Sequence, residues 1–532
     1  MTFRRSRGLF LRLIGGVYLI AFVSLAAQIT GLAGEHGILP VGEFLARAHD
    51  AYGAQAYYAW PTLLWFSPSD ACLSLLCWSG AAVSLLLVAG IAPVVSTALL
   101  WGLYLSVTIA GQDFLQFQWD ALLLETGLLA ILYAPVAWRS RLVTDPEPPA
   151  IVRWALWGLA FKLTFLSGIT KILSGDPTWA NWTALTYHYE TQPIPTWTSW
   201  YMHQLPPSVH FWSAAGMFVI EVAVPWLIFA PPRFARVRLT AAALMISLQL
   251  GIGATGNYGF FNLLAIVLYL ALLDDGTLER VHLWRRPSPE AGLKTRGHEE
   301  PLRSPQAGLT ARGHEEPPPS PQAGPKTRGR DGRPQGPTGG AAIWHLLASG
   351  AALAIAVLSA MTMFREIDTT WGRPGPLRYT WSGSALGLVS PLDSINGYGL
   401  FRVMTTERPE IVIEVSADGT AWKEYEFKWK AGDVRRRPRF VEPHMPRLDW
   451  QMWFAALDPR SAQRWLAPLV QRLLEGDEAV TRLLGPSPIA GRVHCARLVY
   501  YQYHFTTRQE RAVSGAWWKR ERAGDLTNVI CR

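Results

Sequence analysis

The stretch QFQWDALLLETGLLAILYAP, residues Gln116–Pro135, decides how we interpret the fold. A helix that crosses a bilayer needs about 20 mostly apolar residues, and this stretch has that length. Two carboxylates, Asp120 and Glu125, interrupt it. A charge at membrane depth costs at least about 2.5–3.5 kcal/mol, and such residues usually face the interior of a helix bundle. Later apolar segments carry Lys162 and Glu221, so we predict one buried polar cluster of these four residues that holds several helices in register.

Composition and hydropathy predict an integral membrane protein. Half of the 532 residues are hydrophobic, which favours a membrane domain with a polar domain attached. Beyond the quoted stretch, further apolar segments long enough or nearly long enough to span are Leu9–Thr30, Ala71–Ile91, Val94–Gly111, Ile151–Leu173, His210–Ala230, Leu239–Thr255, Tyr258–Leu273 and Ala342–Met363. The predicted fold is an α-helical multi-pass bundle of about nine spans that carries a C-terminal β-rich domain with a helical insertion.

The predicted domain boundaries follow these segments. Residues 1–283 form the membrane domain with spans one to eight, and residues 341–364 form the last span. Between them, residues 284–340 repeat with a period of 16 from Ser288, Ser304 and Ser320. This insert is rich in Pro, Gly and charge, so we predict a disordered cytosolic linker. Residues 365–532 form the soluble domain.

The distribution of Lys and Arg predicts the orientation in the membrane. With the N-terminus in the cytosol, the loop of Arg139 and Arg141, the loop Arg233–Arg238 and the insert are cytosolic. The loop Ser174–Ser208 has no Lys or Arg and then lies outside. An odd number of spans puts the C-terminal domain outside as well, in a lumen or periplasm. The net charge of +9 is thus explained by orientation and solvation, and we expect no nucleic-acid partner.

The C-terminal region alternates between strand and helix patterns. Leu400–Asp433 predicts three strands, with Asp-Gly in 417–420 as a hairpin turn. Arg447–Leu484 predicts helices, and His494–Thr506 predicts another strand, so a β-sandwich with a helical insertion is one possible form. Cys495 and Cys531 can pair if the domain lies on an oxidising side, which the sequence leaves open. Cys72 and Cys77 lie in an apolar span, where we expect them to be packing residues.

Motifs of soluble enzymes are absent from the sequence. No Ser-His-Asp order, phosphate loop, dinucleotide fingerprint or zinc spacing occurs, so we assign no catalytic residue, cofactor or metal. The intramembrane charges leave two alternatives to a structural ion-pair network. One is acid–base chemistry within the membrane, in which Lys171 would also take part, and the other is transport.

The loop Ser174–Ser208 is a second candidate site because it is rich in Trp, Tyr, Pro and Thr. Rigid aromatic side chains make binding surfaces, and they also make membrane-interface belts. The candidate residues are Trp179, Tyr187, His188, Tyr189 and Glu190. Asn181-Trp182-Thr183 matches the acceptor sequence for N-glycosylation, so Asn181 is a possible glycosylation site.

Five longer motifs carry a resemblance to a known family. They are FQWDALLLETGLLAILYAP, LSGITKILSGDPTWANWTALTYHYETQPIPT, ATGNYGFFNLLAIVLYLALLDD, INGYGLFRVMTTERPEIVIEVSADGTAWKEYEFKWKAGD and PRLDWQMWFAAL. In these the chain strongly resembles the lipase maturation factor family, and the likeness covers nearly everything except the repeat insert. It implies a multi-pass membrane protein that helps secreted lipases to fold and assemble into active dimers, without catalysis of its own. The implied location is the endoplasmic reticulum membrane in animals, or the plasma membrane in a bacterial member; the chain ends NVICR, without an endoplasmic-reticulum retrieval signal.

The resemblance also implies where an exported client would bind. The C-terminal domain is implicated in holding the client, and carry-over points to Asn396–Asp433 together with Pro446–Leu457. The candidate client-facing residues are Asn396, Gly397, Tyr398, Gly399, Trp422, Tyr425, Trp429, Trp450 and Trp453. The main alternative is a membrane-embedded enzyme of the vitamin K-dependent carboxylase type with Lys162 as its base, and a transporter is the other.

Overall fold

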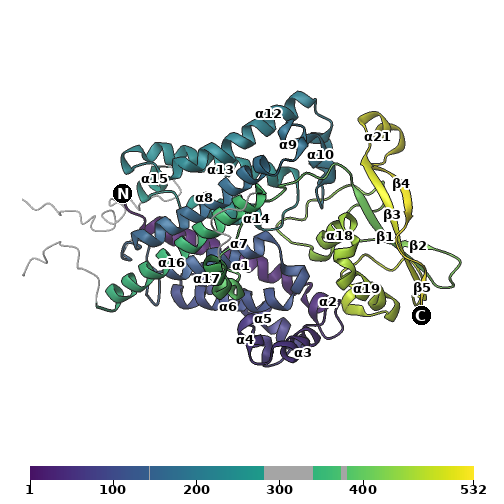
Figure 1. Ribbon diagram of the computed structural model, residues 1–532, viewed down its shortest axis with the longest axis horizontal. Coiled ribbons are helices and arrows are strands. Elements are labelled where there is room, and N and C mark those ends of the chain that lie inside the picture. Colours follow the sequence, from purple (N-terminus) through teal and green to yellow (C-terminus); the bar gives the residue numbers. More distant parts are fainter. Residues whose placement is uncertain (143, 281–338, 373–379) are drawn as a thin grey trace, which may run out of the picture.

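The computed structural model describes residues 1–142, 144–280, 339–372 and 380–532. Helices from the first 280 residues and from 339–370 form a bundle, and the strands form one sheet at the end of the molecule opposite the N-terminus (Figure 1). The predicted repeat insert, residues 284–340, lies almost wholly outside the described residues.

Seven helices of the described residues are long and apolar enough to cross a membrane. They are α1 (Arg4–Ala26), α5 (Asp70–Val88), α6 (Pro93–Ala110), α8 (Ala150–Leu173), the continuous helix Pro207–Phe229, α13 (Ala235–Thr255) and α16 (Gly339–Thr370). Pro207–Phe229 consists of α12 (Pro207–Phe218), a π-helical turn η3 (Val219–Ala223) and a 3-10 segment η4 (Val224–Phe229). The predicted class, a multi-pass helical bundle with a β-containing C-terminal region, is confirmed.

Two of the predicted spans form shorter helices. The stretch quoted first becomes α7 (Gln118–Tyr133), whose 16 residues rise about 24 Å, which is less than the hydrocarbon core of about 30 Å. Before it lies the 3-10 turn η2 (Gln112–Leu115), and Pro135 follows its end. The other is α14 (Phe261–Leu270). Both helices are buried among the longer ones, so the prediction of about nine spans counts two short interior helices with the seven long ones.

Small residues allow close packing between the membrane helices. A Cβ on Gly80 of α5 would lie 2.5 Å from the Phe22 ring of α1, and α1 packs along α5. A Cβ on Gly168 of α8 would lie 2.8 Å from Cβ of Glu221 in η3. Glycine is required at these two crossings because any side chain would push the helices apart.

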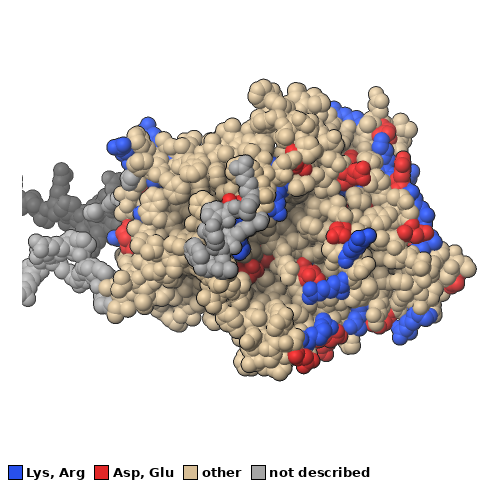
Figure 2. Space-filling model, viewed as in Figure 1, with Lys and Arg blue, Asp and Glu red and all other residues tan. Residues whose placement is uncertain are grey.

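Ion pairs gather at the end of the bundle that holds the N-terminus. Arg4 pairs with Glu147 at 3.1 Å, and the buried Arg238 pairs with Asp274 at 3.3 Å. Figure 2 shows few charged side chains over the membrane helices, apart from some near the centre of the view; most gather at this end and over the C-terminal region. An apolar band between two charged ends is what a membrane-spanning bundle requires.

Short helices fill the connections. They are α2 (Ile29–Ala33), α3 (Val41–Tyr52), α4 (Gln55–Ala59), η1 (Leu63–Trp65), α9 (Pro177–Ala180), α10 (Ala184–Thr191), α11 (Trp197–His203), η5 (Pro232–Phe234), α15 (Asp275–Arg280), α17 (Thr380–Val389) and η8 (Ser390–Leu392).

The C-terminal sheet is antiparallel, with strand order β2-β1-β3-β4 and β5 paired to β3. Its strands are β1 (Pro409–Ser416), β2 (Lys423–Tyr425), β3 (Cys495–Phe505), β4 (Trp518–Asp525) and β5 (Ile530–Cys531). Helices α18 (Arg447–Leu457), α19 (Pro459–Glu475) and α20 (Glu478–Thr481) form the predicted helical insertion, and α21 (Arg508–Ser514) joins β3 to β4. Ile411, Ile413 and Leu498 pack with α18 and α19 in one core.

Two details of the strand prediction are wrong. Leu400–Asp433 holds two strands instead of three, because Trp429 and Lys430 donate their backbone N–H groups to Asp449 of α18 instead of a neighbouring strand. The described part of the C-terminal region has one sheet covered by helices, so it is not a sandwich.

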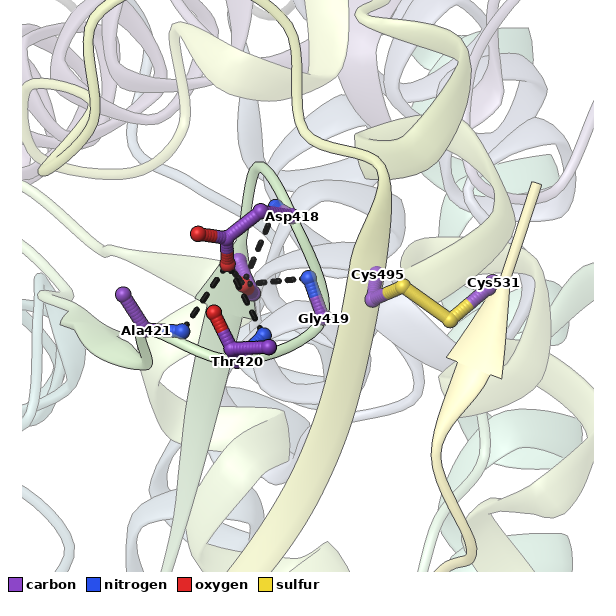
Figure 3. The surroundings of a disulfide bond; sticks show 7 residues. Asp418, Gly419, Thr420, Ala421, Cys495 and Cys531 are labelled. Atoms are coloured by element: carbon purple, nitrogen blue, oxygen red, sulfur yellow. Dashed lines mark hydrogen bonds between the residues drawn. A yellow bond between two sulfur atoms is a disulfide. The ribbon is translucent and has the colours of Figure 1, made fainter.

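The hairpin between β1 and β2 is confirmed, and it lies beside a disulfide (Figure 3). The Asp418 carboxylate accepts from the backbone N–H groups of Thr420 and Ala421 at 2.8 and 2.9 Å, and Gly419 takes φ +78°. Cys495 and Cys531 form a disulfide that joins β3 to the last strand. The pairing that the sequence left open is therefore present, whereas Cys72 and Cys77 are free.

Candidate functional site

Asp120 forms a buried ion pair with Arg447, the first residue of α18. The carboxylate is bidentate, with guanidinium nitrogens at 2.7 and 2.8 Å, and Tyr104 donates its hydroxyl to the same carboxylate. Both charged side chains are almost fully excluded from solvent. Burial by itself lowers the pKa of Arg447, but the adjacent Asp120 carboxylate outweighs it and the pKa is raised, so the guanidinium stays charged. This pair fastens the C-terminal region to the short helix α7.

Glu125, one turn further along α7, collects donors from three other parts of the chain. It accepts from Lys162 of α8, from the hydroxyl of Ser359 of α16 at 2.9 Å and from the hydroxyl of Tyr398 at 2.6 Å. The backbone N–H of Asn396 also donates to it, at 3.3 Å. A buried carboxylate with this many partners holds the two long helices and the segment that leads to the sheet in one arrangement.

Glu221 pairs with Lys171 at 2.8 Å. Glu221 lies on the π-helical turn η3, and Gly168 allows that turn to approach α8 one turn before Lys171. The prediction of one cluster is therefore corrected to three ion pairs, because Asp120, Glu125 and Glu221 each pair with a different cation. The sequence does not identify Arg447 and Lys171 as the partners of these carboxylates. Lys171 is predicted there only as a candidate for acid–base chemistry. The only feature that marks Arg447 in the sequence is a positive charge at the start of an apolar helix.

Four of the nine residues predicted to face a client lie inside the molecule. Tyr398, Tyr425, Trp450 and Trp453 are buried, so the prediction of an exposed surface is wrong for them. Trp453 donates its indole N–H to the carbonyl of Thr191, a contact between α18 and α10.

The glycine-containing part of that predicted surface contacts the membrane helices. Asn396 and Gly399 donate backbone N–H groups to Glu125 and Gln118 of α7, and a Cβ on Gly397 would meet Glu366 of α16. Trp422 and Trp429 are half-buried, and of the predicted client-facing residues only these two tryptophans keep partly accessible rings.

The loop Ser174–Ser208 is a platform on which the C-terminal region docks. Glu190 accepts from the backbone N–H of Phe505 at 2.7 Å and lies 3.0 Å from Nδ1 of His504. Trp179 donates its indole N–H to the carbonyl of Phe401 at 3.0 Å. Of the predicted loop residues, Glu190 and Trp179 therefore bind the C-terminal region, while Tyr187 is exposed and the acceptor Asn181 is exposed after α9.

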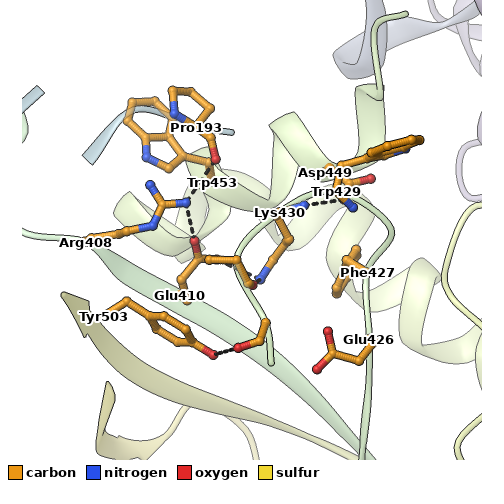
Figure 4. A network of polar contacts seen from close by, with 12 residues as sticks. Pro193, Arg408, Glu410, Glu426, Phe427, Trp429, Lys430, Asp449, Trp453 and Tyr503 are labelled. Carbon is orange, nitrogen blue, oxygen red and sulfur yellow. Dashed lines mark hydrogen bonds and ion pairs between the residues drawn. The ribbon is translucent and has the colours of Figure 1, made fainter. Parts of the chain in front are cut away.

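Arg408 is the centre of this docking surface (Figure 4). It is fully buried and donates to the carbonyls of Glu190 and Pro193 at 2.8 and 3.0 Å. It also pairs with Glu410 of β1 at 2.7 Å, and Lys430 approaches the other oxygen of Glu410 at 2.7 Å. The sheet is thus attached to the loop by charged side chains as well as by apolar contacts.

A cavity of about 480 Å³ lies between the loop and the membrane helices. The predicted loop residues Trp179, His188 and Tyr189 line it, as does the Lys171–Glu221 pair. Burial lowers the pKa of His188 to about 4, with Lys171 adding to the effect, so this imidazole is neutral at pH 7. In the described parts of the chain, no group of three or more His, Cys, Asp or Glu is arranged to hold a metal ion.

Glu442 should make stability depend on pH. It accepts from the backbone N–H of Tyr258, and burial raises its pKa from 4.5 to about 7. The unfolded carboxyl loses its proton near pH 4.5 but the folded one near pH 7, so stability falls as pH rises through this interval, by about 3 kcal/mol in total. Above pH 7 the carboxyl is ionised in both states, so its contribution to stability no longer changes with pH.

Glu442→Gln isolates this effect, because the amide oxygen keeps the acceptor and does not titrate. We expect the unfolding temperatures of variant and parent to converge near pH 4.5 and the variant to be more stable at pH 8. Thermal unfolding of both proteins in detergent between pH 4.5 and 8 measures the difference. A constant difference across that interval would show that Glu442 does not titrate near pH 7.

Comparison with known proteins gives two family matches. The lipase maturation factor transmembrane domain matches residues 5–280, and the lipase maturation factor C-terminal domain matches residues 394–528. Lipase maturation factor 2 of Homo sapiens is 38% identical over 97% of this chain and 81% of its own length. Lipase maturation factor 2 of Xenopus laevis is 36% identical over 99% and 82%, and lipase maturation factor 1 of Mus musculus is 30% identical over 98% and 86%. No solved structure matches the chain significantly.

Proposed function

This chain belongs to the lipase maturation factor family, and we propose on that ground that it assists the folding or assembly of exported proteins, lipases first among them, without catalysing a reaction. The observation that carries the proposal is the match of both family domains together with relatives aligned over nearly the whole chain. In this role the buried charges Asp120, Glu125, Lys162 and Glu221 hold the bundle and its C-terminal region together.

The proposed client surface is the face of the sheet opposite α18 and α19. Val412 and Glu414 of β1 alternate with the core residues and so lie on this side of the sheet, where both are buried; the accessible part of this face is made by longer side chains around them. Arg497 pairs with Glu414 at 2.6 Å and lies over the Trp422 ring at 4.4 Å.

The neighbouring part of this face also has an arginine that pairs with a carboxylate and lies over an aromatic ring. Arg520 of β4 crosses to Glu424 of β2 at 2.9 Å and lies over the Tyr501 ring at 4.5 Å. Trp422 and Tyr501 are half-buried. Trp, Tyr and Arg are the residues that dominate binding energy at protein interfaces, so this face has the chemistry of a binding surface.

The proposed orientation keeps the N-terminus in the cytosol and the C-terminal region in a lumen or periplasm. The N-terminus and the sheet lie at opposite ends of the molecule (Figure 1), which supports it. The Cys495–Cys531 disulfide also supports it, since disulfides persist on the oxidising side of a membrane. The membrane would be that of the endoplasmic reticulum in a eukaryote and the plasma membrane in a bacterium.

The test is maturation of a secreted lipase. The full chain is co-expressed with the lipase in cells that lack their own maturation factors, and lipase activity per mass of secreted lipase is measured. We expect the parent chain to raise this specific activity and Trp422→Ala with Tyr501→Ala to reduce the gain by about tenfold, as loss of interface anchors does.

The matched control is Arg482→Ala with Glu478→Ala, an exposed pair formed by the first residue of α20 and the residue after its end, away from the proposed surface. It should leave the gain unchanged. If the parent chain raises no lipase activity, the maturation proposal fails. If both double variants act like the parent, the client binds elsewhere.

A further inference from the structure

We propose that the cavity beneath the loop Ser174–Ser208 binds an uncharged lipid that carries a hydroxyl group and enters from the bilayer. The inference is independent of the maturation proposal, because it follows from the walls, the mouth and the polar groups of the cavity. Its volume of about 480 Å³ lies within the roughly 300–1,000 Å³ typical of small-molecule sites.

The walls of the cavity are mainly apolar. They come from α8 to α14 and from η3, and Leu400 and Phe401 close one side. Apolar residues that line it include Leu163, Leu185, Met217, Ile220, Leu248 and Ile252. Such walls favour a hydrocarbon chain over water.

The mouth of the cavity opens between α12 and α13. Small residues of both helices, Ser213 on α12 and Gly251 and Ala254 on α13, line the cavity and are themselves exposed. Large apolar side chains on these helices also face outward, with Trp212 70% and Leu250 60% exposed. Both helices are membrane spans, so this opening faces lipid and an occupant would enter from the bilayer.

One polar atom in the wall, the amide oxygen of Gln249, lacks a hydrogen-bond partner. Gln249 is 7% exposed, and its Oε1 accepts no hydrogen bond. An unsatisfied buried acceptor costs roughly 1–3 kcal/mol, which a donor on a ligand would recover. A hydroxyl group on the bound molecule meets this requirement.

His188 adds a second acceptor to the cavity. Tyr258 donates its hydroxyl to Oε1 of Gln192, because the Gln192 amide nitrogen already donates to Ser199 and Thr255. The Tyr258 oxygen, 3.0 Å from Nε2 of His188, therefore accepts a hydrogen from that nitrogen. In the neutral ring this leaves Nδ1 unprotonated, so Nδ1 can accept a hydrogen bond from a donor on a ligand.

The charges in the cavity disfavour an anionic head group. Lys171 and Glu221 face it as a pair at 2.8 Å, and Lys171 also donates to the carbonyl of Ser167. An anionic head group would have to displace Glu221 and leave that carboxylate buried without a partner, which is strongly unfavourable. An uncharged head group leaves the pair intact.

Three photoactivatable probes with the same diazirine-bearing acyl chain test the proposal on the full-length protein in phosphatidylcholine nanodiscs. They are a monoacylglycerol, the free fatty acid and the fatty-acid methyl ester. The hydroxyl of the monoacylglycerol should give about tenfold more cross-linking to peptides of α12 and α13 than the methyl ester, and the fatty acid should label weakly. Excess unlabelled monoacylglycerol should suppress the labelling. Equal labelling by all three probes, or labelling that excess lipid leaves unchanged, would overturn the proposal.

Two variants locate the site. Gly251→Phe fills the cavity, and a Cβ at that position meets no atom within 4 Å. Gly216→Phe on α12 is the matched control, since its Cβ also meets nothing and Gly216 is exposed but does not line the cavity. Labelling should fall about tenfold in the first and stay unchanged in the second, with equal unfolding temperatures. Gln249→Leu should abolish the preference for monoacylglycerol over methyl ester. Retention of both labelling and preference in the cavity variants would contradict a lipid at this place.

Discussion

Arg447→Met should lower the free energy of unfolding by about 3–5 kcal/mol, because it leaves the Asp120 carboxylate buried and unpaired. The two side chains are 1% and 0% exposed, so water cannot replace the lost partner. The loss should appear as a lower unfolding temperature of the purified protein in detergent. It should also appear as faster proteolysis of the C-terminal region, since the pair joins α18 to α7.

A double variant separates the loss of a pair from the burial of a lone charge. Asp120→Leu with Arg447→Met removes both charges and should recover most of the stability that Arg447→Met loses. Arg482→Ala breaks an exposed pair with Glu478 and should change stability by less than about 1 kcal/mol. If the double variant is as unstable as the single one, the Arg447 side chain contributes mainly through packing and hydrogen bonds to the backbone.

Glu125→Ala should lower the free energy of unfolding by a similar amount, about 3–5 kcal/mol, because buried Lys162 loses its paired carboxylate while Tyr398 and Ser359 lose an acceptor. Thermal unfolding measures the loss. Limited proteolysis shows whether α16 and the segment 394–400 come loose together, as expected when one carboxylate holds both.

Lys162→Arg distinguishes this structural role from catalysis. Arginine keeps the positive charge but does not act as a base near neutral pH, and its larger head group should reduce stability by less than Glu125→Ala does. Under the proposed function, lipase maturation then survives in proportion to the amount of folded protein. Complete loss of maturation in a stably folded Lys162→Arg protein would favour the membrane-embedded enzyme.

The local elements were predictable because their signals are local. Apolar runs place the membrane helices, and Asp-Gly at 418–419 places the β1–β2 hairpin. The amphipathic pattern over Arg447–Leu484 predicts the helices that cover the sheet. The third strand was predicted wrongly because the backbone N–H groups of Trp429 and Lys430 donate to the Asp449 carboxylate of α18 instead of to a neighbouring strand, and the alternating side-chain pattern does not distinguish the two cases.

The candidate site was only half predictable. The carboxylates and Lys162 stand out in the sequence because a charge in an apolar run needs a partner. The family resemblance implied that Tyr398 and Trp453 face a client, yet these side chains are buried where the C-terminal region meets the membrane domain. Burial by a distant part of the chain leaves no mark on the local pattern.

The sequence by itself determined that this protein spans a membrane, that three buried acids and a lysine need partners and that a β-containing region follows the helices. Only the tertiary structure decided which partners they have. Asp120 and Arg447 are separated by 327 positions, and the chain holds 49 Lys and Arg residues, any of which would satisfy the electrostatic requirement. The requirement for a counter-charge follows from burial, which the sequence predicts, but the choice among the cations follows from the packing of α18 against α7, which only the folded chain determines.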